Sequence, residues 1–234
     1  MDVTIPTSNG SIGGYLAVPQ PEVSGDGPWP GVVIVFDAFG MSDDIREIAD
    51  RFATAGYFAL VPNLYHRGGF VRCVQGVFRQ LFNAEGQAFD DIEAARTELL
   101  SHPNSNGKVG VAGFCMGGGF ALVTAARGFD ASAPYYGPMP LDDSVFDDAC
   151  PIVASFGGRD AGLRGAADKL DRLLTERDVP HDVKEYPKAG HGFANRLPVG
   201  PFAPLLRIAG LGYDHEANAD AWKRVLAFFA THLR

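Results

Sequence analysis

The stretch KVGVAGFCMGGGFALVTAARG, residues 108–128, decides the fold. An apolar run rich in valine ends at Gly113, and a second apolar run resumes after a group of three more glycines. The first run predicts a buried strand and the second predicts a helix, so the glycines fall at a strand-to-helix turn. Cys115, one of three cysteines in the chain, stands at that turn.

Three further segments predict buried strands, because each is a short apolar run closed by Gly, Pro or Asp. They are residues 32–37, 57–62 and 151–157, and helical patterns occupy residues 42–56, 89–102, 166–178 and 215–233. Strands that alternate with helices favour one doubly wound α/β domain over residues 1–234, with a mostly parallel sheet and helices on both faces. The turn-rich residues 19–31 predict a surface loop. In such a sheet, functional groups gather at the carboxyl ends of the strands.

Composition excludes several kinds of partner. The 234-residue chain has a formal net charge of −8 and no block of lysines or arginines, which argues against binding to nucleic acid or to an anionic membrane. The N-terminal segment has no secretory pattern, and no apolar run reaches the roughly 20 residues that span a bilayer. We therefore expect a cytoplasmic protein in which Cys73, Cys115 and Cys150 are thiols. Without a C-x-x-C pair or nearby histidines at ligand spacing, the cysteines predict no metal site.

The glycines around Cys115 match the pattern of a nucleophile elbow, with sulfur in place of the serine oxygen. A residue on so sharp a turn is strained, and glycines beside it avoid collisions with the turn. The N-terminus of the following helix favours a thiolate and any oxyanion formed nearby. The Met116 amide would be one oxyanion donor, and an amide after the first buried strand would be the other. The alternative is a structural cysteine buried at a close helix–strand contact.

A thiol nucleophile needs a base, and the base needs an acid that orients it. Asp160 follows the strand predicted at residues 151–157, and His191 follows another strand predicted at residues 182–186. Both have neighbouring glycines, and both come after Cys115 in the order nucleophile, acid, histidine. The alternatives are that Asp160 only caps the next helix and that His191 is a surface loop residue.

Six segments together resemble the dienelactone hydrolase family of α/β-hydrolases: VVIVFDAFGM, LVPNLYHR, SNGKVGVAGFCMGGGFAL, APYYG, FGGRD and AGHGFAN. The likeness extends over nearly the whole chain, and GFCMGG with AGHGFAN are its most specific parts. The resemblance implies an α/β-hydrolase fold and a catalytic triad of Cys115, His191 and Asp160. It also implies oxyanion-hole amides from Ala38 and Met116, and no cofactor.

The resemblance further implies an acid that contacts the resting thiol, and Asp37 stands at that position where well-known members carry glutamate. Asp37 is one methylene shorter, and the alternative is a loop acid that caps the next turn. An arginine that holds a substrate carboxylate is expected after the histidine motif, but Asn195 stands there, followed by Arg196, so Asn195 is the candidate substrate contact at this position. A second arginine is expected after LVPNLYHR, where Arg72 and Arg79 are candidates.

The aromatic residues Phe39, Tyr65 and Tyr136 match positions that could line a substrate pocket, or they serve only for packing. These features predict a hydrolase of small esters or lactones that works through an acyl-enzyme intermediate. The alternative is a ligand-binding module on the same fold with little or no turnover. The natural substrate and the oligomeric state are left open, and residues 196–212 suit a lid, a partner surface or a buried segment.

Overall fold

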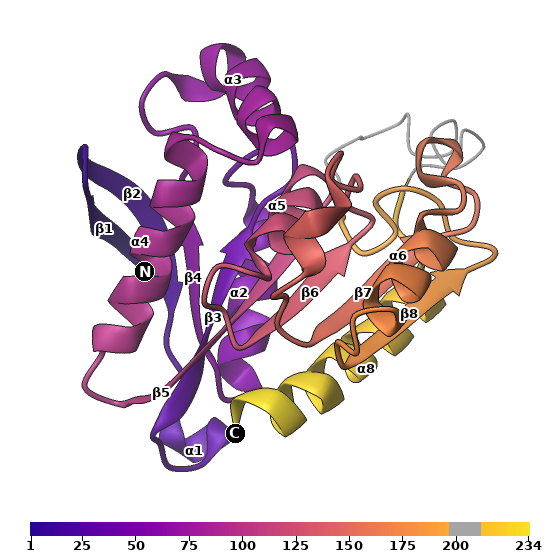
Figure 1. Ribbon diagram of the computed structural model, residues 1–234. Coiled ribbons are helices and arrows are strands. Elements are labelled where there is room, and N and C mark those ends of the chain that lie inside the picture. The colour runs from indigo at the N-terminus through magenta and orange to yellow at the C-terminus, as the bar shows by residue number, and fades with distance from the viewer. Residues whose placement is uncertain (197–211) are drawn as a thin grey trace.

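The computed structural model describes residues 1–196 and 212–234, apart from the side chains of residues 70 and 71. Within these residues, eight strands form one sheet in the order β1-β2-β4-β3-β5-β6-β7-β8 (Figure 1). The segment at residues 196–212 lies almost entirely outside the described residues. The strands are β1 (Asp2–Thr7), β2 (Gly10–Ala17), β3 (Trp29–Val35), β4 (Phe58–Pro62), β5 (Ser105–Phe114), β6 (Ala131–Tyr135), β7 (Ile152–Gly157) and β8 (His181–Tyr186).

Helices cover both faces of the twisted sheet (Figure 1). On one face, α2 and α8 pack together, and the rings of Phe52 and Phe229 lie 6.1 Å apart between them. On the other face, Phe89 of α4 contacts Phe120 of α5, and α5 shares a hydrophobic cluster with α6. The helices are α1 (Pro21–Ser24), α2 (Asp43–Thr54), α3 (Gly69–Asn83), α4 (Gln87–Ser101), α5 (Met116–Thr124), α6 (Ala166–Thr175) and α8 (His215–Leu233), with short 3-10 turns at Asp143–Phe146 and Ala161–Leu163.

The central strands are buried on both sides, as strands covered by helices must be. Residues 32–35 of β3 are fully buried. β3 pairs in parallel with β4 and β5, and the parallel order continues through β6, β7 and β8. In the described sheet, the antiparallel pairings are those of β2 with its two neighbours, β1 and β4. The carboxyl ends of six parallel strands therefore meet at one rim, and the loops that leave β3, β5, β7 and β8 carry the candidate site residues.

The predicted α/β architecture is confirmed, while some local predictions differ from the structure. The sequence analysis missed β1, β2, β6 and α3. Glycines interrupt β2 and α3, small residues make up most of β6, and β1 is short and contains a proline, which weakens a strand pattern. The prediction of a surface loop at residues 19–31 is wrong at both ends of the segment. Pro21–Ser24 forms α1, and the buried Trp29 begins β3. None of the helices in residues 1–196 and 212–234 combines the length and the apolar composition that crossing a bilayer requires.

Candidate active site

Cys115 occupies the single residue between the end of β5 and the start of α5. Its backbone angles are φ 56° and ψ −116°, a conformation that residues with a side chain rarely adopt. The glycines are required by space. A Cβ atom on Gly113 would lie 1.9 Å from the Gly117 carbonyl oxygen, and one on Gly117 would lie 2.0 Å from the Val35 oxygen. Only glycine lets α5 approach the sheet so closely, and the turn leaves Cys115 partly exposed.

Asp160 and His191 meet above the ends of β7 and β8. The Nδ1 atom of His191 lies 2.6 Å from Oδ2 of Asp160, within hydrogen-bond distance. The other carboxylate oxygen of Asp160 accepts a hydrogen bond from the Gly162 amide at 3.0 Å, so Asp160 also caps the 3-10 turn that follows it. Asp160 therefore both caps the 3-10 turn and pairs with His191. Asp160 is 8% exposed, so its position is fixed by both contacts.

His191 also lies close enough to the Cys115 thiol for the two groups to interact, so the imidazole contacts Asp160 and is influenced by the sulfur. Burial by itself lowers the pKa of His191, but the hydrogen bond to Asp160 and the interaction with Cys115 outweigh burial and raise this pKa to about 10. An imidazolium next to a sulfur favours the thiolate, which is the nucleophilic form of cysteine.

The Ala38 and Met116 residues, which the resemblance implies as oxyanion donors, are linked by a buried tyrosine. The Tyr65 hydroxyl donates a hydrogen bond to the Ala38 carbonyl oxygen at 3.2 Å, and it lies 3.7 Å from the Met116 sulfur. Tyr65 is 5% exposed, and burial raises its pKa well above the ordinary value, so the hydroxyl stays protonated as a donor. Tyr65 thus holds the loop after β3 against the start of α5.

Asp37 lies on the loop after β3 and is 5% exposed. Its Oδ1 accepts a hydrogen bond from the Phe39 amide at 2.8 Å, which is the contact expected of an acid that caps a turn. Burial raises the pKa of Asp37 to about 6, with a smaller contribution from the charge of Asp44. The described residues contain no hydrogen bond between Asp37 and the Cys115 thiol. The proposed contact with the resting thiol stays a prediction.

A chain of hydrogen bonds that the sequence analysis did not anticipate supports the His191 loop. The hydroxyl of Tyr136 donates to the amide oxygen of Asn195, and the amide nitrogen of Asn195 donates to Asp44 at 2.8 Å. Tyr136 is fully buried with a φ of 38°, and its ring centre lies 5.2 Å from that of His191. Asn195 is 1% exposed, so its amide is committed at both ends. No sequence motif connects Asp44 with Asn195, because 151 residues separate them.

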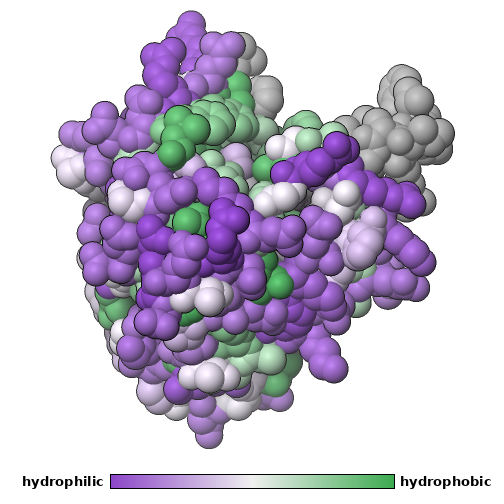
Figure 2. All heavy atoms as spheres, turned by 45° about the vertical axis from the view of Figure 1, so that its right-hand side comes forward, coloured by the Kyte–Doolittle hydropathy of each residue, from purple (hydrophilic) through white to green (hydrophobic). Residues whose placement is uncertain are grey.

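The remaining candidate residues lie at the surface. Phe39 is 54% exposed, and Arg72 and Arg79 are exposed on α3. Phe82 and Leu141 are the other large exposed apolar side chains in the described chain outside the N-terminal region. On the face drawn in Figure 2, hydrophilic residues cover most of the surface, and the most extended apolar area lies toward the top. Among the described residues, no group of His, Cys, Asp or Glu side chains is arranged to hold a metal ion.

The sheet order, the helices on both faces and the sharp turn at Cys115 define an α/β-hydrolase fold. Known structures agree: an acylaminoacyl peptidase of Pyrococcus horikoshii superposes with a TM-score of 0.72 at 16% identity, over 99% of this chain and 41% of that one. A dienelactone hydrolase from Anabaena variabilis superposes with a TM-score of 0.71 at 20% identity, over 100% and 98% of the two chains.

The sequence comparison narrows this class to one family. A model of the dienelactone hydrolase family matches residues 12–233, and the chain belongs to that family. The carboxymethylenebutenolidase of Pseudomonas putida is 32% identical over 216 residues, which cover 87% of this chain and 86% of that protein. The predictions of the family, of the fold and of a hydrolase are confirmed.

Proposed function

We propose that the protein hydrolyses small esters or lactones with Cys115 as the nucleophile, His191 as the base and acid, and Asp160 as the orienting carboxylate. The observation that carries this proposal is the His191–Asp160 pair at 2.6 Å next to a thiol on a strained turn. A structural cysteine needs neither the imidazole nor the strain. Strained residues of this kind gather at functional sites because the strain holds a reactive group in position.

In the proposed reaction, the Cys115 thiolate attacks the carbonyl carbon, and the carbonyl π electrons move to the oxygen. The amides of Ala38 and Met116 donate to that oxyanion, and each such donor contributes about 3 kcal/mol in other acyl-transfer enzymes. The tetrahedral intermediate collapses, and His191 gives its proton to the leaving alkoxide. Water then attacks the thioester while His191 accepts its proton, and release of the acid restores the thiolate.

The surroundings of the triad favour neutral substrates over those with a carboxylate. Asn195 stands where an arginine is implied, and its amide is used by Tyr136 and Asp44. The buried carboxyl group of Asp37 lies near His191, so the carboxylate of a substrate would meet repulsion there. We therefore expect faster turnover of neutral esters and lactones than of carboxylate-bearing lactones.

The test compares Cys115→Ala with Cys150→Ala on p-nitrophenyl esters and on lactones with and without a carboxylate. Burial raises the pKa of Cys150 to about 12, so this thiol is a suitable inert control. We expect Cys115→Ala to lose at least about three orders of magnitude in kcat, as loss of a catalytic nucleophile does in other hydrolases. Cys150→Ala should retain activity. Full turnover by Cys115→Ala would refute the mechanism.

The first turnover distinguishes a hydrolase from the alternative, a ligand-binding module. An acyl-enzyme predicts a burst of p-nitrophenol with an amplitude near one per protein chain, followed by slower release of the acid. Iodoacetamide should also label Cys115 faster than Cys73 and Cys150, and His191→Ala should remove that difference. A protein that binds the esters without a burst and without steady turnover would be a binding module.

A further inference from the structure

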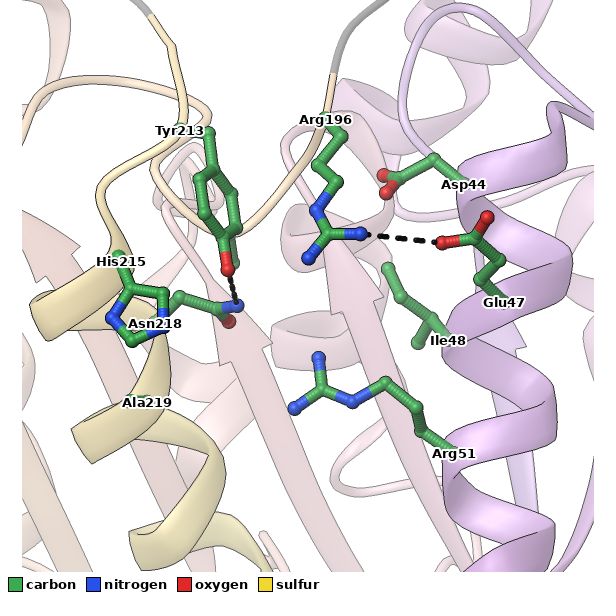
Figure 3. A pocket seen from close by; sticks show the side chains of 10 residues that line it. Asp44, Glu47, Ile48, Arg51, Arg196, Tyr213, His215, Asn218 and Ala219 are labelled. Carbon is green, nitrogen blue, oxygen red and sulfur yellow. Dashed lines mark hydrogen bonds and ion pairs between the residues drawn. The ribbon is translucent and has the colours of Figure 1, made fainter.

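A second pocket lies between α2 and α8, apart from the Cys115 thiol, and has a volume of about 220 Å³ (Figure 3). Arg51 and Glu47 of α2 line one wall, and His215 and Asn218 of α8 line the other. Ala194 and Arg196, the neighbours of Asn195, also line the pocket, as does Asp44, which accepts a hydrogen bond from Asn195. The triad does not use this pocket.

The guanidinium group of Arg51 enters the pocket from α2 (Figure 3). It lies 4.1 Å above the Trp222 ring, and stacking on an aromatic face leaves the N–H groups at its edge free to donate. In the described chain, Arg51 forms no ion pair and no hydrogen bond with a carboxylate. Its charge is therefore not neutralised by an acid of these residues.

The guanidinium group of Arg196 enters the same pocket from above (Figure 3). It lies 5.2 Å from the centre of the Tyr213 ring and 3.6 Å from the Glu47 carboxylate. Both partners of this ion pair are about two-thirds exposed, at 66% and 64%. An exposed pair at this distance contributes little to stability, so a better ligand can replace Glu47.

The wall opposite the arginines also presents polar groups. Asn218 is 5% exposed, and its amide nitrogen donates a hydrogen bond to the Tyr213 hydroxyl at 3.1 Å. His215 is the first residue of α8, a helix of 19 residues whose N-terminal end carries partial positive charge. Of the acids at the pocket, Asp44 is already bonded to Asn195 and Glu47 is exposed.

We propose that this pocket binds a small oxyanion, either a carboxylate or a phosphate group, between the guanidinium groups of Arg51 and Arg196. Two planar guanidinium groups that converge on one hollow suit the oxygens of such an anion, which can accept a pair of N–H donors from each arginine. Without an anion, the charges of the two guanidinium groups are offset by the Glu47 ion pair and by the nearby carboxylate of Asp44. When the anion binds, it replaces the Glu47 carboxylate as the partner of Arg196.

This exchange gives the proposal a test with effects of opposite sign. Inorganic phosphate and succinate are titrated separately by calorimetry, with sodium chloride at equal ionic strength as the blank. Arg51→Gln and Arg196→Gln each remove one guanidinium group that donates hydrogen bonds to the anion. Each substitution should therefore raise the dissociation constant at least about tenfold. Glu47→Gln removes the carboxylate that competes with the anion for Arg196 and repels the anion. The dissociation constant should therefore fall by roughly threefold or more.

The matched control is Arg46→Gln, which changes the charge of the same helix α2 by the same amount. Arg46 pairs with Asp2 at 2.7 Å and does not line the pocket, so binding should be unchanged in this variant. The phosphate and succinate titrations show which anion is preferred. The proposal is overturned if neither anion saturates the wild-type protein below about 50 mM. It is also overturned if Glu47→Gln and Arg51→Gln change binding no more than Arg46→Gln does.

Discussion

Replacing Cys115 by glycine is expected to give a more stable protein than replacing it by alanine, which reverses the usual order. Both variants lack the thiol, so they differ only by the Cβ atom. At φ 56° and ψ −116°, that atom is held in a strained conformation. Strain of this kind costs about 1–3 kcal/mol for a residue with a side chain, and glycine avoids most of it.

The magnitude follows from two opposing contributions. Glycine should regain the 1–3 kcal/mol of strain. Glycine also has a more flexible unfolded chain, which ordinarily makes it less stable than alanine by about 0.4–1 kcal/mol. The free energy of unfolding of the glycine variant should therefore be higher than that of the alanine variant by about 1.3 kcal/mol, within a range of about 0–2.6 kcal/mol. For a chain of this length, each kcal/mol corresponds to roughly 2–4 °C in Tm.

Urea unfolding of Cys115→Gly and Cys115→Ala measures this difference directly, provided that the two variants share one m-value. The control pair is Cys150→Gly and Cys150→Ala, because Cys150 is not among the described residues with positive φ. At position 150, alanine should be the more stable. If alanine is also the more stable at position 115, by the same margin as at position 150, then the turn is not strained and the argument for a nucleophile elbow fails.

Three further predictions test the surroundings of the thiol. Gly113→Ala should cost about 3 kcal/mol or more in urea unfolding and should slow thiol labelling, because its Cβ would lie 1.9 Å from a carbonyl oxygen. Gly76 in α3 has open space around it, so Gly76→Ala should be neutral or should stabilise the protein by about 0.5–1 kcal/mol. Equal effects of Gly113→Ala and Gly76→Ala on stability would contradict the packing argument. Asp37→Asn should stabilise the protein on the order of 3 kcal/mol well above pH 6 and not near pH 4. The reason is that the folded-state pKa of about 6 lies above the ordinary value of about 3.9, so stability falls as pH rises between these values. A gain independent of pH would contradict this assignment. Tyr136→Phe leaves the buried amide oxygen of Asn195 without its hydrogen-bond donor, so the free energy of unfolding should fall by about 1–3 kcal/mol. In the same variant, kcat should fall with little change in KM. An unchanged kcat would show that the hydroxyl does not support the site.

The sequence predicted those parts of the molecule whose physical cause is local. β3, β4, β5 and β7 are short apolar runs, and a parallel sheet buried on both faces requires such runs. Cys115, Asp160 and His191 became candidates from the sequence because each follows a predicted strand and has glycines beside it, and the structure brings Asp160 and His191 together. The strand β2 was missed because its sequence, GSIGGYLA, is half-exposed and rich in glycine.

Contacts between distant segments could not be predicted in this way. The bond between Asn195 and Asp44 depends on the depth at which the His191 loop meets α2, and neither segment has a pattern that encodes this depth. The Tyr65 hydroxyl likewise acts between two loops that meet only in the folded chain. Sequence reasoning took Asn195 as a substrate contact from its position in the motif. Because Asn195 is buried and uses both ends of its amide in hydrogen bonds, our proposal assigns it a structural role in supporting the His191 loop.

The strained residues of the site are held by the sheet itself. Cys115 and Tyr136, both with positive φ, each follow the last residue of a neighbouring parallel strand, β5 or β6. The Cys115 amide donates to the Tyr135 carbonyl oxygen at 3.1 Å, and the Tyr136 amide donates to the Ser155 oxygen at 2.8 Å. The ladder of hydrogen bonds thus continues one residue past each strand, into the strained turns. Because a buried parallel sheet is rigid, it can hold the sulfur and the tyrosine ring beside His191 in conformations that a surface loop would relax.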